Sequence, residues 1–431
     1  MTLSAHSDEF VKETVYAGTL DCGLQVMVMP KKNFRKKCAV LGVNFGSIDN
    51  CFRSAGNGGE ITIPAGVAHF LEHKMFEKED GDVFLEFSRT GANANAGTSF
   101  TSTKYLFSCT TGFEKNLEIL MDFVQEPYFT EATVTKEKGI IAEELRMYND
   151  SPGWVVFFNL LRALYHNHPV RIDIGGTLES IQEISHHTLH KCWQTFYHPG
   201  NMGMFVAGNV DPEQVFAQVE ANYAPRAYQE LSTERIMPTE PDEVAEKCIS
   251  RAMPVKRAKF LLGFKDRNAS LRGRDFLKRH VVMNLLMSIL FGGSSEFYLR
   301  HYESGLIDDD TFGAEFMAER EFGVCMVGGD TEDPRRLEAV IVEEFEKAMT
   351  TDLIERHFAR NRKKALGKTI GAYNYPESCA SALGGAFFNG YDIFDPPKIL
   401  QKIQVRDFRD HLQKHYDIND YAVSLVTGLE S

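Results

Sequence analysis

A proline-containing segment in the middle of the chain separates two stretches in which the same kinds of predicted elements recur. Residues 225–243 hold three prolines, are rich in Glu and Thr, and lack hydrophobic periodicity, which is typical of a linker. A chain of 431 residues is also too long for one compact core. We therefore predict an N-terminal domain over 1–225, a linker over 226–245 and a C-terminal domain over 246–431.

Both halves alternate between the period of two that is typical of strands and the wider spacing that is typical of helices. The elements predicted in the first half are strands at 24–28 and 41–45, a short helix after Pro64, a helix at 82–90, strands at 93–98 and 104–110, helices starting at 113 and 131, and a strand at 202–206. The elements predicted in the second half are a strand at 260–264, a helix at 274–291, strands at 311–317 and 322–327, helices at 334–349 and 353–368, and a strand at 421–426. The fold class is therefore α+β, with two similar α/β modules, each a mostly antiparallel sheet packed with helices.

The charge balance and the cysteine pattern narrow the class of protein. The chain has 47 basic and 60 acidic residues and a net charge of -13, which argues against nucleic acid or an anionic membrane as a partner. No stretch approaches the roughly 18 apolar residues of a membrane span, and residues 1–13 show no secretory signal pattern. Eight scattered cysteines without a Cys-x-x-Cys pair fit reduced thiols. We therefore expect a cytoplasmic protein without nucleic-acid or membrane partners.

The segment His69-Phe70-Leu71-Glu72-His73 predicts a metal site. His69 and His73 are four residues apart, so on a helix both imidazoles project from one face about one turn apart. Two neutral imidazoles at that separation can bind one zinc ion at about 2.0–2.1 Å. Glu72 lies beside the same face, where it can accept a proton from water instead of coordinating the metal. This is the His-x-x-Glu-His order of the inverzincin motif.

A hydrolytic zinc site usually needs a third protein ligand, and the next long helix offers one. Glu137 and Glu144 are seven residues apart, so they share a face of that helix. Ile140 and Ile141 are expected to form the buried stripe beside them, and a glutamate turned inward there needs a cation to offset its burial. Glu143 competes with Glu144 for the ligand position, but it lies about 100° around the helix, and we therefore favour Glu144.

Simpler interpretations exist for these residues. The two histidines of the motif can be incidental polar residues on an amphipathic helix, and glutamates on helices are mostly solvated. A rival metal site is formed in sequence by His186, His187 and His190, which follow Ser185. That cluster lacks an evident carboxylate partner beyond Glu183, and we interpret it as a polar helical face.

Taken together, the motifs resemble the pitrilysin/insulinase family of zinc metallopeptidases, which combines His-x-x-Glu-His with a glutamate pair seven residues apart on a later helix. Further segments that match the family are Asn95-Ala96 with Thr98 and Tyr105, His168-Pro169, Gly176, and Tyr197 to Met202. The resemblance covers most of residues 15–225 and is closest to short bacterial members. In those members one polypeptide forms half of a clam-shell.

The resemblance implies a role for each residue of the two motifs. His69, His73 and Glu144 would be the zinc ligands. Glu72 would be the general base, and Glu137 would be a second carboxylate that orients a ligand. The chemistry agrees, because two histidines, one glutamate and water form a known hydrolytic zinc set, and neighbouring carboxylates commonly fix the orientation of ligand imidazoles.

The strand that follows residue 91 is predicted to bind substrate. Its small side chains let another backbone approach closely, which suits an edge strand that accepts a peptide as an added strand. In the family that the chain resembles, the substrate pairs with this edge. The residues assigned to this surface are Ala92, Asn93, Ala94, Asn95 and Ala96. The alternative is a strand of small residues that packs under a helix.

Two features depart from the family pattern. The interval between His73 and Glu144 is shorter than usual, which implies trimmed loops. The second half of the family commonly offers an Arg and a Tyr seven residues apart that hold the substrate, but His301 and Asp308 occupy those positions here. In the family's heterodimers one subunit carries zinc and the other carries this pair. We therefore expect a catalytic subunit with a partner of similar fold, either a different chain or a second copy.

The resulting hypothesis is a zinc-dependent endopeptidase that hydrolyses peptides or small unfolded polypeptides. One alternative is a non-catalytic scaffold or assembly subunit of the same fold, and another is a protease dedicated to one peptide precursor. The complete set of four motif residues argues against the scaffold, because a scaffold needs none of them. The sequence leaves open the substrate, the cleavage preference and the identity of the partner.

Overall fold

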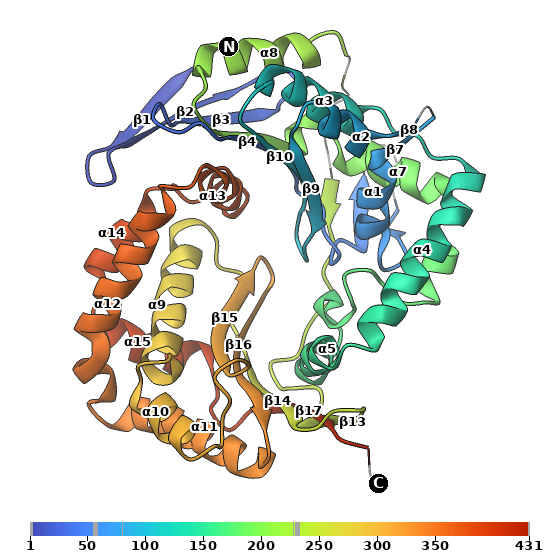
Figure 1. The fold of residues 1–431 in the computed structure, drawn as a ribbon. Coiled ribbons are helices and arrows are strands. Elements are labelled where there is room, and N and C mark those ends of the chain that lie inside the picture. The colour runs from blue at the N-terminus through green and yellow to red at the C-terminus, as the bar shows by residue number, and fades with distance from the viewer. Residues whose placement is uncertain (1–2, 55–58, 80, 227, 229–232, 430–431) are drawn as a thin grey trace.

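Two β-sheets, one from each half of the chain, form the framework of the protein (Figure 1). This computed structural model describes every residue except 1–2, 55–58, 80, 227, 229–232 and 430–431, so part of the predicted linker lies outside the described residues. The strands of the first sheet are β1 (Ser4–Asp8), β2 (Glu13–Thr19), β3 (Gln25–Pro30), β4 (Lys37–Val43), β9 (Asn93–Thr98), β10 (Thr103–Cys109) and β11 (Met202–Gly208). The strands of the second sheet are β13 (Cys248–Ala252), β14 (Ala258–Lys265), β15 (Gly313–Glu319), β16 (Phe322–Thr331) and β17 (Tyr421–Thr427).

The two sheets repeat one strand order. The first runs β1-β2-β3-β11-β4-β10-β9, and its last five strands correspond to the order β13-β17-β14-β16-β15 of the second. In both sheets one pair is parallel, β3 with β11 and β13 with β17, and the other pairs are antiparallel. These observations confirm the prediction of two similar, mostly antiparallel modules. Short strands complete the structure: β5 (Cys51–Ser54), β6 (Ile61–Thr62), β7 (Glu77–Lys78), β8 (Gly81–Asp82) and β12 (Thr233–Arg235).

Helices cover both sheets. Those of the first half are α1 (Val67–Phe76), α2 (Val83–Arg89), α3 (Phe113–Gln125), α4 (Glu131–Asn149), α5 (Pro152–Leu164), α6 (Ser180–Glu183), α7 (His186–Phe196) and α8 (Pro212–Tyr223), with the 3-10 turns η1 (Pro169–Arg171) and η2 (Pro199–Asn201). Those of the second half are α9 (Gly273–Phe291), α10 (Glu296–Glu303), α11 (Pro334–Thr350), α12 (Leu353–Ala372), α13 (Pro376–Asn389), α14 (Asp395–Lys402) and α15 (Val405–His415). The predicted elements are found within a few residues of their expected limits.

Each half also lends one helix to the other half. Helix α5 packs on β14 and β17 of the second sheet, and helix α13 packs on β4 and β11 of the first. A glycine makes each contact possible: a Cβ at Gly42 would lie 2.7 Å from the Phe388 ring, and a Cβ at Gly263 would lie 2.9 Å from the Leu160 side chain. The halves are therefore interlocked by these two helices. The predicted domain limits, 1–225 and 246–431, divide the two sheets but not the helices that pack on them, and they stay a prediction.

A buried ionic cluster joins the halves near the linker. Asp49 is fully buried and accepts hydrogen bonds from Arg235 of β12 at 2.9 Å and from Arg320 at 2.7 Å. Asp49 lies between β4 and β5, and Arg320 lies in the turn between β15 and β16, so one carboxylate holds together a loop of the first half, the linker strand and a turn of the second sheet. We call Asp49, Arg235 and Arg320 the Asp49 cluster.

One helical stretch among the described residues, Gly273–Glu303, is long and apolar enough to cross a membrane by length and composition. Its most apolar window is 61% buried inside the fold. The core helix of a folded module passes the same test, so this stretch is weak support for a membrane segment.

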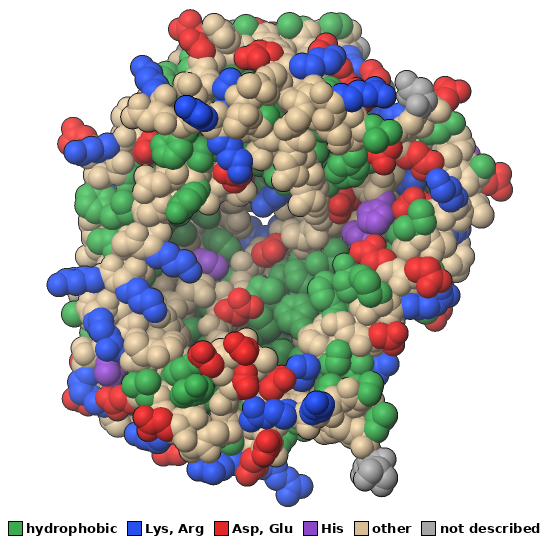
Figure 2. Space-filling view, in the orientation of Figure 1, with side chains coloured by type: hydrophobic (Ala, Val, Ile, Leu, Met, Phe, Trp, Pro, Cys, Tyr) green, Lys and Arg blue, Asp and Glu red, His purple; other side chains and the backbone are tan. Residues whose placement is uncertain are grey.

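The two sheets and the long helices surround a hollow (Figures 1 and 2). Apolar side chains gather on the wall of this hollow, and histidine side chains lie at its edge next to acidic ones (Figure 2). The edge strands of the first sheet are β1 and β9, and β9 borders the hollow beside α1 (Figure 1).

Candidate metal centre

Helix α1 presents two imidazoles on one side because its other side is apolar and buried. His69 and His73 are partly exposed, and their ring centroids lie 4.6 Å apart. The side that packs into the core of the first module contains Val67, Phe70, Leu71 and Met75. Burial of these side chains fixes the rotation of the helix and therefore the direction in which both imidazoles point.

A glycine sets the start of α1. Gly66 has φ +92°, a left-handed conformation that favours glycine. A Cβ at Gly66 would also lie 2.3 Å from the carbonyl oxygen of Gly175. The loop at Gly175 in turn packs close to His69, since a Cβ on Gly175 would lie 3.5 Å from Nδ1 of that ring. The side of α1 that presents His69 and His73 is thus held from outside the helix as well.

Helix α4 brings the two predicted glutamates to α1. Thr130 caps this helix, and Glu137 and Glu144 lie on the side that faces α1. Ile141 is buried as predicted, but Ile140 is 48% exposed, so that part of the predicted buried stripe is wrong. The inward face of α4 runs along Val134, Ile141 and Leu145 at helical spacing, which leaves Ile140 outside it.

The structure brings His69, His73 and Glu144 together. One ligand atom from each lies within 4.8 Å of the other two. Nε2 of His69 is 3.8 Å from one carboxylate oxygen of Glu144, and Nε2 of His73 is 3.7 Å from the other. Zinc bonds of about 2.0–2.2 Å at tetrahedral angles require ligand atoms about 3.3 Å apart, so small side-chain movements suffice. The chemistry and spacing of these three side chains fit a zinc ion.

Glu137 lies behind His73. One carboxylate oxygen of Glu137 is 2.9 Å from Nδ1 of His73, and Glu137 is only 8% exposed. A carboxylate at Nδ1 favours the tautomer that carries its proton there, which leaves Nε2 free for a metal. This is the position expected for a residue that orients a ligand.

Glu72 precedes His73 on α1, and its carboxylate forms a hydrogen bond with the end of β9. Its Oε2 accepts a hydrogen bond from the hydroxyl of Thr98, at the end of β9, over 2.7 Å. Burial raises the pKa of Glu72, and the bond from Thr98 only partly offsets that effect. A carboxylate with a raised pKa is better suited to accept and return a proton near neutral pH.

The two imidazoles have pKa values shifted in opposite directions. Burial, followed by the nearby His73, lowers the pKa of His69 to about 3. Burial alone would lower the pKa of His73 as well, but the bond to Glu137 and the charges of Glu72 and Glu144 outweigh it and raise that pKa. The negative charge around His73 is therefore the charge that a cation would neutralise.

The predicted substrate strand is β9 with the preceding Ala92. Its residues alternate in exposure: Asn93, Asn95 and Gly97 are exposed, whereas the alanines between them pack against the core. The strand contacts α1 and α2 and is also the edge of the seven-stranded sheet. One face of the strand therefore packs under helices, and its edge is unpaired within the described part of the chain, so the assignment of these residues to substrate binding stays a prediction.

His301 and Asp308 are engaged within the second module. His301 is 7% exposed and its ring lies 4.4 Å from that of Phe297. Asp308 accepts a hydrogen bond from Arg257 at 3.2 Å. Neither side chain is presented as a free group that holds a peptide.

The rival histidines form no metal site with other described residues. The rings of His186 and His187 are tilted against each other with centroids 3.9 Å apart, and His190 packs against Phe129. Within the described ranges, His69, His73 and Glu144 are the one group of three or more His, Cys, Asp or Glu side chains close enough to share an ion.

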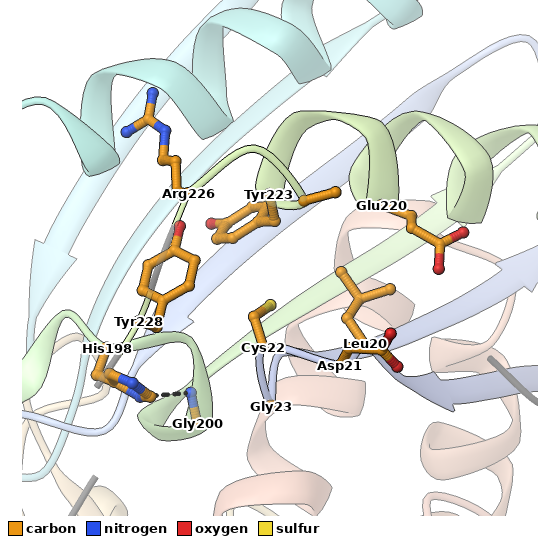
Figure 3. Close-up of a pocket in the computed structure, with 11 residues that line it drawn as sticks. Leu20, Asp21, Cys22, Gly23, His198, Gly200, Glu220, Tyr223, Arg226 and Tyr228 are labelled. Atoms are coloured by element: carbon orange, nitrogen blue, oxygen red, sulfur yellow. Dashed lines mark hydrogen bonds between the residues drawn. The ribbon is translucent and has the colours of Figure 1, made fainter. Parts of the chain in front are cut away.

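The cavities that described residues of the first module line include one at the candidate centre and one away from it. One of about 530 Å³ adjoins the candidate centre and is lined by His73, Glu137, Phe76, Phe84 and Ile140 among others. The other, of about 660 Å³, lies between the turn before β3, η2 and the end of α8, where the backbone N–H of Gly200 donates to Nδ1 of His198 (Figure 3). None of the candidate metal ligands lines the second cavity.

The sequence argument did not predict how two neighbours of the centre, Thr98 and Tyr148, contact it. Thr98 matched the family pattern in sequence, but nothing in the spacing indicates its bond to Glu72. Tyr148, one helical turn after Glu144, stacks on Trp154 with ring centroids 4.4 Å apart. Burial and then the Glu144 carboxylate raise the pKa of Tyr148 to about 12. The i,i+4 spacing on a predicted helix is the one signal that could have found Tyr148.

The fold and this centre define a class of protein: a two-module α+β chain with the ligand set of hydrolytic zinc enzymes. Comparison with known families is consistent with that class. Residues 55–178 match the family described as Insulinase (Peptidase family M16), and residues 183–365 match the Peptidase M16 inactive domain. The chain belongs to the insulinase family, peptidase family M16.

Known relatives match either nearly the whole chain or about half of it. An uncharacterized zinc protease of Bacillus subtilis, YmfH, is 44% identical over 424 residues, which cover 97% of each chain. The beta subunit of the mitochondrial-processing peptidase of Caenorhabditis elegans is 30% identical over 53% of this chain and 49% of its own. A crystal structure from Alicyclobacillus acidocaldarius, described as M16-like, matches with TM-score 0.93 at 33% identity over 100% of this chain and 99% of the other.

Proposed function

We propose that this chain is a zinc-dependent endopeptidase that hydrolyses peptides or small unfolded polypeptides. The observation that carries the proposal is the convergence of three ligand atoms from α1 and α4, within 4.8 Å of one another, with the partly buried carboxylate of Glu72 on the same helix as the two histidines. Membership of a family whose relatives are named zinc proteases supports it. A scaffold subunit would have no use for this set of side chains.

His69, His73 and Glu144 would hold the zinc ion. A zinc ion bound there would lower the pKa of water and polarise a scissile carbonyl. Glu72 would then accept a proton from water and return it to the leaving amine, for which its raised pKa is suited. Glu137 would keep Nε2 of His73 directed at the ion through the contact at Nδ1.

The substrate would bind as an added strand on β9. An unpaired edge supplies backbone donors and acceptors to any extended peptide, so recognition would depend little on sequence. The exposed side chains of this strand are small or short, which lets a second backbone approach. Apolar side chains on the wall of the hollow (Figure 2) favour unfolded segments over folded proteins.

We also propose that the enzyme works with a second subunit of similar fold. His301 packs against Phe297 and Asp308 binds Arg257, so the positions where the family offers substrate-holding groups contribute none here. A relative named as the beta subunit of a processing peptidase supports a paired arrangement. All eight cysteines are free thiols, which supports our proposal of a cytoplasmic location.

The direct test is Glu72→Gln, a substitution that preserves size and removes the base. Zinc content should stay near one ion per chain, whereas cleavage of an unstructured peptide should fall at least about a thousandfold, because the amide cannot accept the proton from water. The measurement is metal analysis with a fluorogenic peptide assay, for the chain alone and mixed with a genomic neighbour of similar fold. The matched control is Glu143→Gln, whose side chain is 76% exposed and binds Arg146. Full activity in Glu72→Gln would remove the mechanism.

A further inference from the structure

The carboxylate of Glu72 is attached to the sheet edge through one residue. The hydroxyl of Thr98 donates to Oε2 of Glu72 over 2.7 Å, and this bond joins α1 to the last residue of β9. Glu72 has rotatable bonds between the helix and the carboxylate, so its position in the helix alone does not fix the direction of its oxygens. A group that accepts a proton must hold one oxygen toward the donor within hydrogen-bond reach.

The backbone around Thr98 is held from both sides. Thr98 pairs with Thr103 in the ladder between β9 and β10, and the turn that follows is closed by a bond from the N–H of Ser99 to the carbonyl of Ser102 at 2.7 Å. The same turn is tied to the second module, because Thr101 donates to Glu319. Threonine is β-branched and therefore stiff at χ1, so its hydroxyl points in a fixed direction.

We propose that Thr98 is a positioning residue, whose hydroxyl fixes the carboxylate of Glu72 for proton transfer. The proposal rests on the proposed function of Glu72 as the base. Thr98 ends the strand on which the peptide would pair, so the proposed substrate-binding edge is joined directly to the base by a hydrogen bond. A shift of β9 would therefore move the partner of Glu72 as well.

The test compares Thr98→Val with Thr98→Ser. Valine keeps the β-branched shape and removes the hydroxyl, and serine keeps the hydroxyl. We expect Thr98→Val to lower kcat by about 10- to 100-fold with KM and zinc content unchanged, and Thr98→Ser to recover kcat to within a few fold of the parent. A merely structural role would change KM or the unfolding midpoint and would not be rescued by serine.

The matched control is Thr103→Val, on the facing position of β10. The hydroxyl of Thr103 donates to the carbonyl of Phe45 at 2.9 Å and not to Glu72. This variant should lower the thermal midpoint at least as much as Thr98→Val while kcat stays within a few fold. Equal losses of kcat in both valine variants would overturn the proposal.

A second measurement does not depend on catalysis. Crystal structures of the parent and of Thr98→Val should show the Glu72 carboxylate turned away from its parent position in the variant, with His69 and His73 unmoved. An unchanged carboxylate would overturn the proposal even if the chain proved inactive. An inactive parent with a displaced carboxylate in Thr98→Val would instead count against the proposed function and leave the positioning role supported.

Discussion

At the scale of single residues, the candidate centre depends on contacts between groups that are far apart in sequence. Glu137 meets His73 across 64 positions, and Glu72 meets Thr98 across 26. The motif residues themselves could be named from sequence, because two histidines at i,i+4 and two glutamates at i,i+7 each share one helical face. The bond from Thr98 could not be named, because helical periodicity carries no information about which strand end lies against α1.

We predict that Glu137→Gln weakens zinc binding. The glutamine amide is neutral, so it favours a proton on Nδ1 of His73 less than the carboxylate does. Metal affinity should therefore fall about 10- to 100-fold. The measurement is a competition titration with a chelating dye on the metal-free chain. Glu143→Gln serves as the control, because its exposed side chain faces away from the centre. Equal affinity in Glu137→Gln and the parent would contradict the orienting role.

At the scale of elements, long periodic helices were predicted best. The helix expected to span 131 to 149 is α4, with those limits, because its apolar stripe is regular and Thr130 caps it. Helix α13 was not predicted, since its sequence is rich in small residues and contains Gly384 and Gly385. Small residues give little amphipathic signal, and they are needed there because α13 packs on the sheet of the other half.

We predict that Gly66→Ala disturbs the start of α1. The left-handed backbone costs about 1–2 kcal/mol for alanine, and the clash with the carbonyl of Gly175 adds to this. The free energy of unfolding should fall and zinc affinity should fall with it, as measured by denaturant unfolding and metal titration.

The control for that variant is Gly139→Ala on α4. Gly139 is exposed, has ordinary helical backbone, and a Cβ there would meet nothing within 4 Å. Alanine should therefore stabilise α4 by about 0.5–1 kcal/mol. If Gly66→Ala proved as neutral as Gly139→Ala, the contact between α1 and the Gly175 loop would not be what sets the helix start.

At the scale of the whole molecule, the halves are joined by exchanged helices and by the Asp49 cluster. The Asp49 side chain is shielded from water and contacts two guanidinium groups. It is 0% exposed, whereas the side chains of Arg235 and Arg320 are 21% and 14% exposed. Removal of the shared anion would leave two half-buried cations facing each other. The joint between the halves therefore rests on this carboxylate as well as on the exchanged helices.

We predict that Asp49→Asn loosens the joint between the halves. Breaking a buried ionic cluster by loss of one partner costs about 3–5 kcal/mol, so the unfolding midpoint should drop and limited proteolysis in the linker should become faster. The control is Glu234→Gln on the same linker strand. Its exposed ion pair with Arg53 of β5 is worth under about 1 kcal/mol. Unchanged proteolysis in Asp49→Asn would argue that the exchanged helices hold the halves without the cluster.

The sequence by itself determined the local features: the helices and strands with regular apolar spacing, the His-x-x-Glu-His motif, the later glutamate pair and the presence of two similar modules. These follow from short-range geometry, because helical and strand periods decide which side chains share a face. Only the tertiary structure decided that α4 lies against α1, that α5 and α13 cross to the opposite sheets, and that Thr98 and Glu72 meet. Those arrangements depend on the packing of whole surfaces against one another, which no local period encodes.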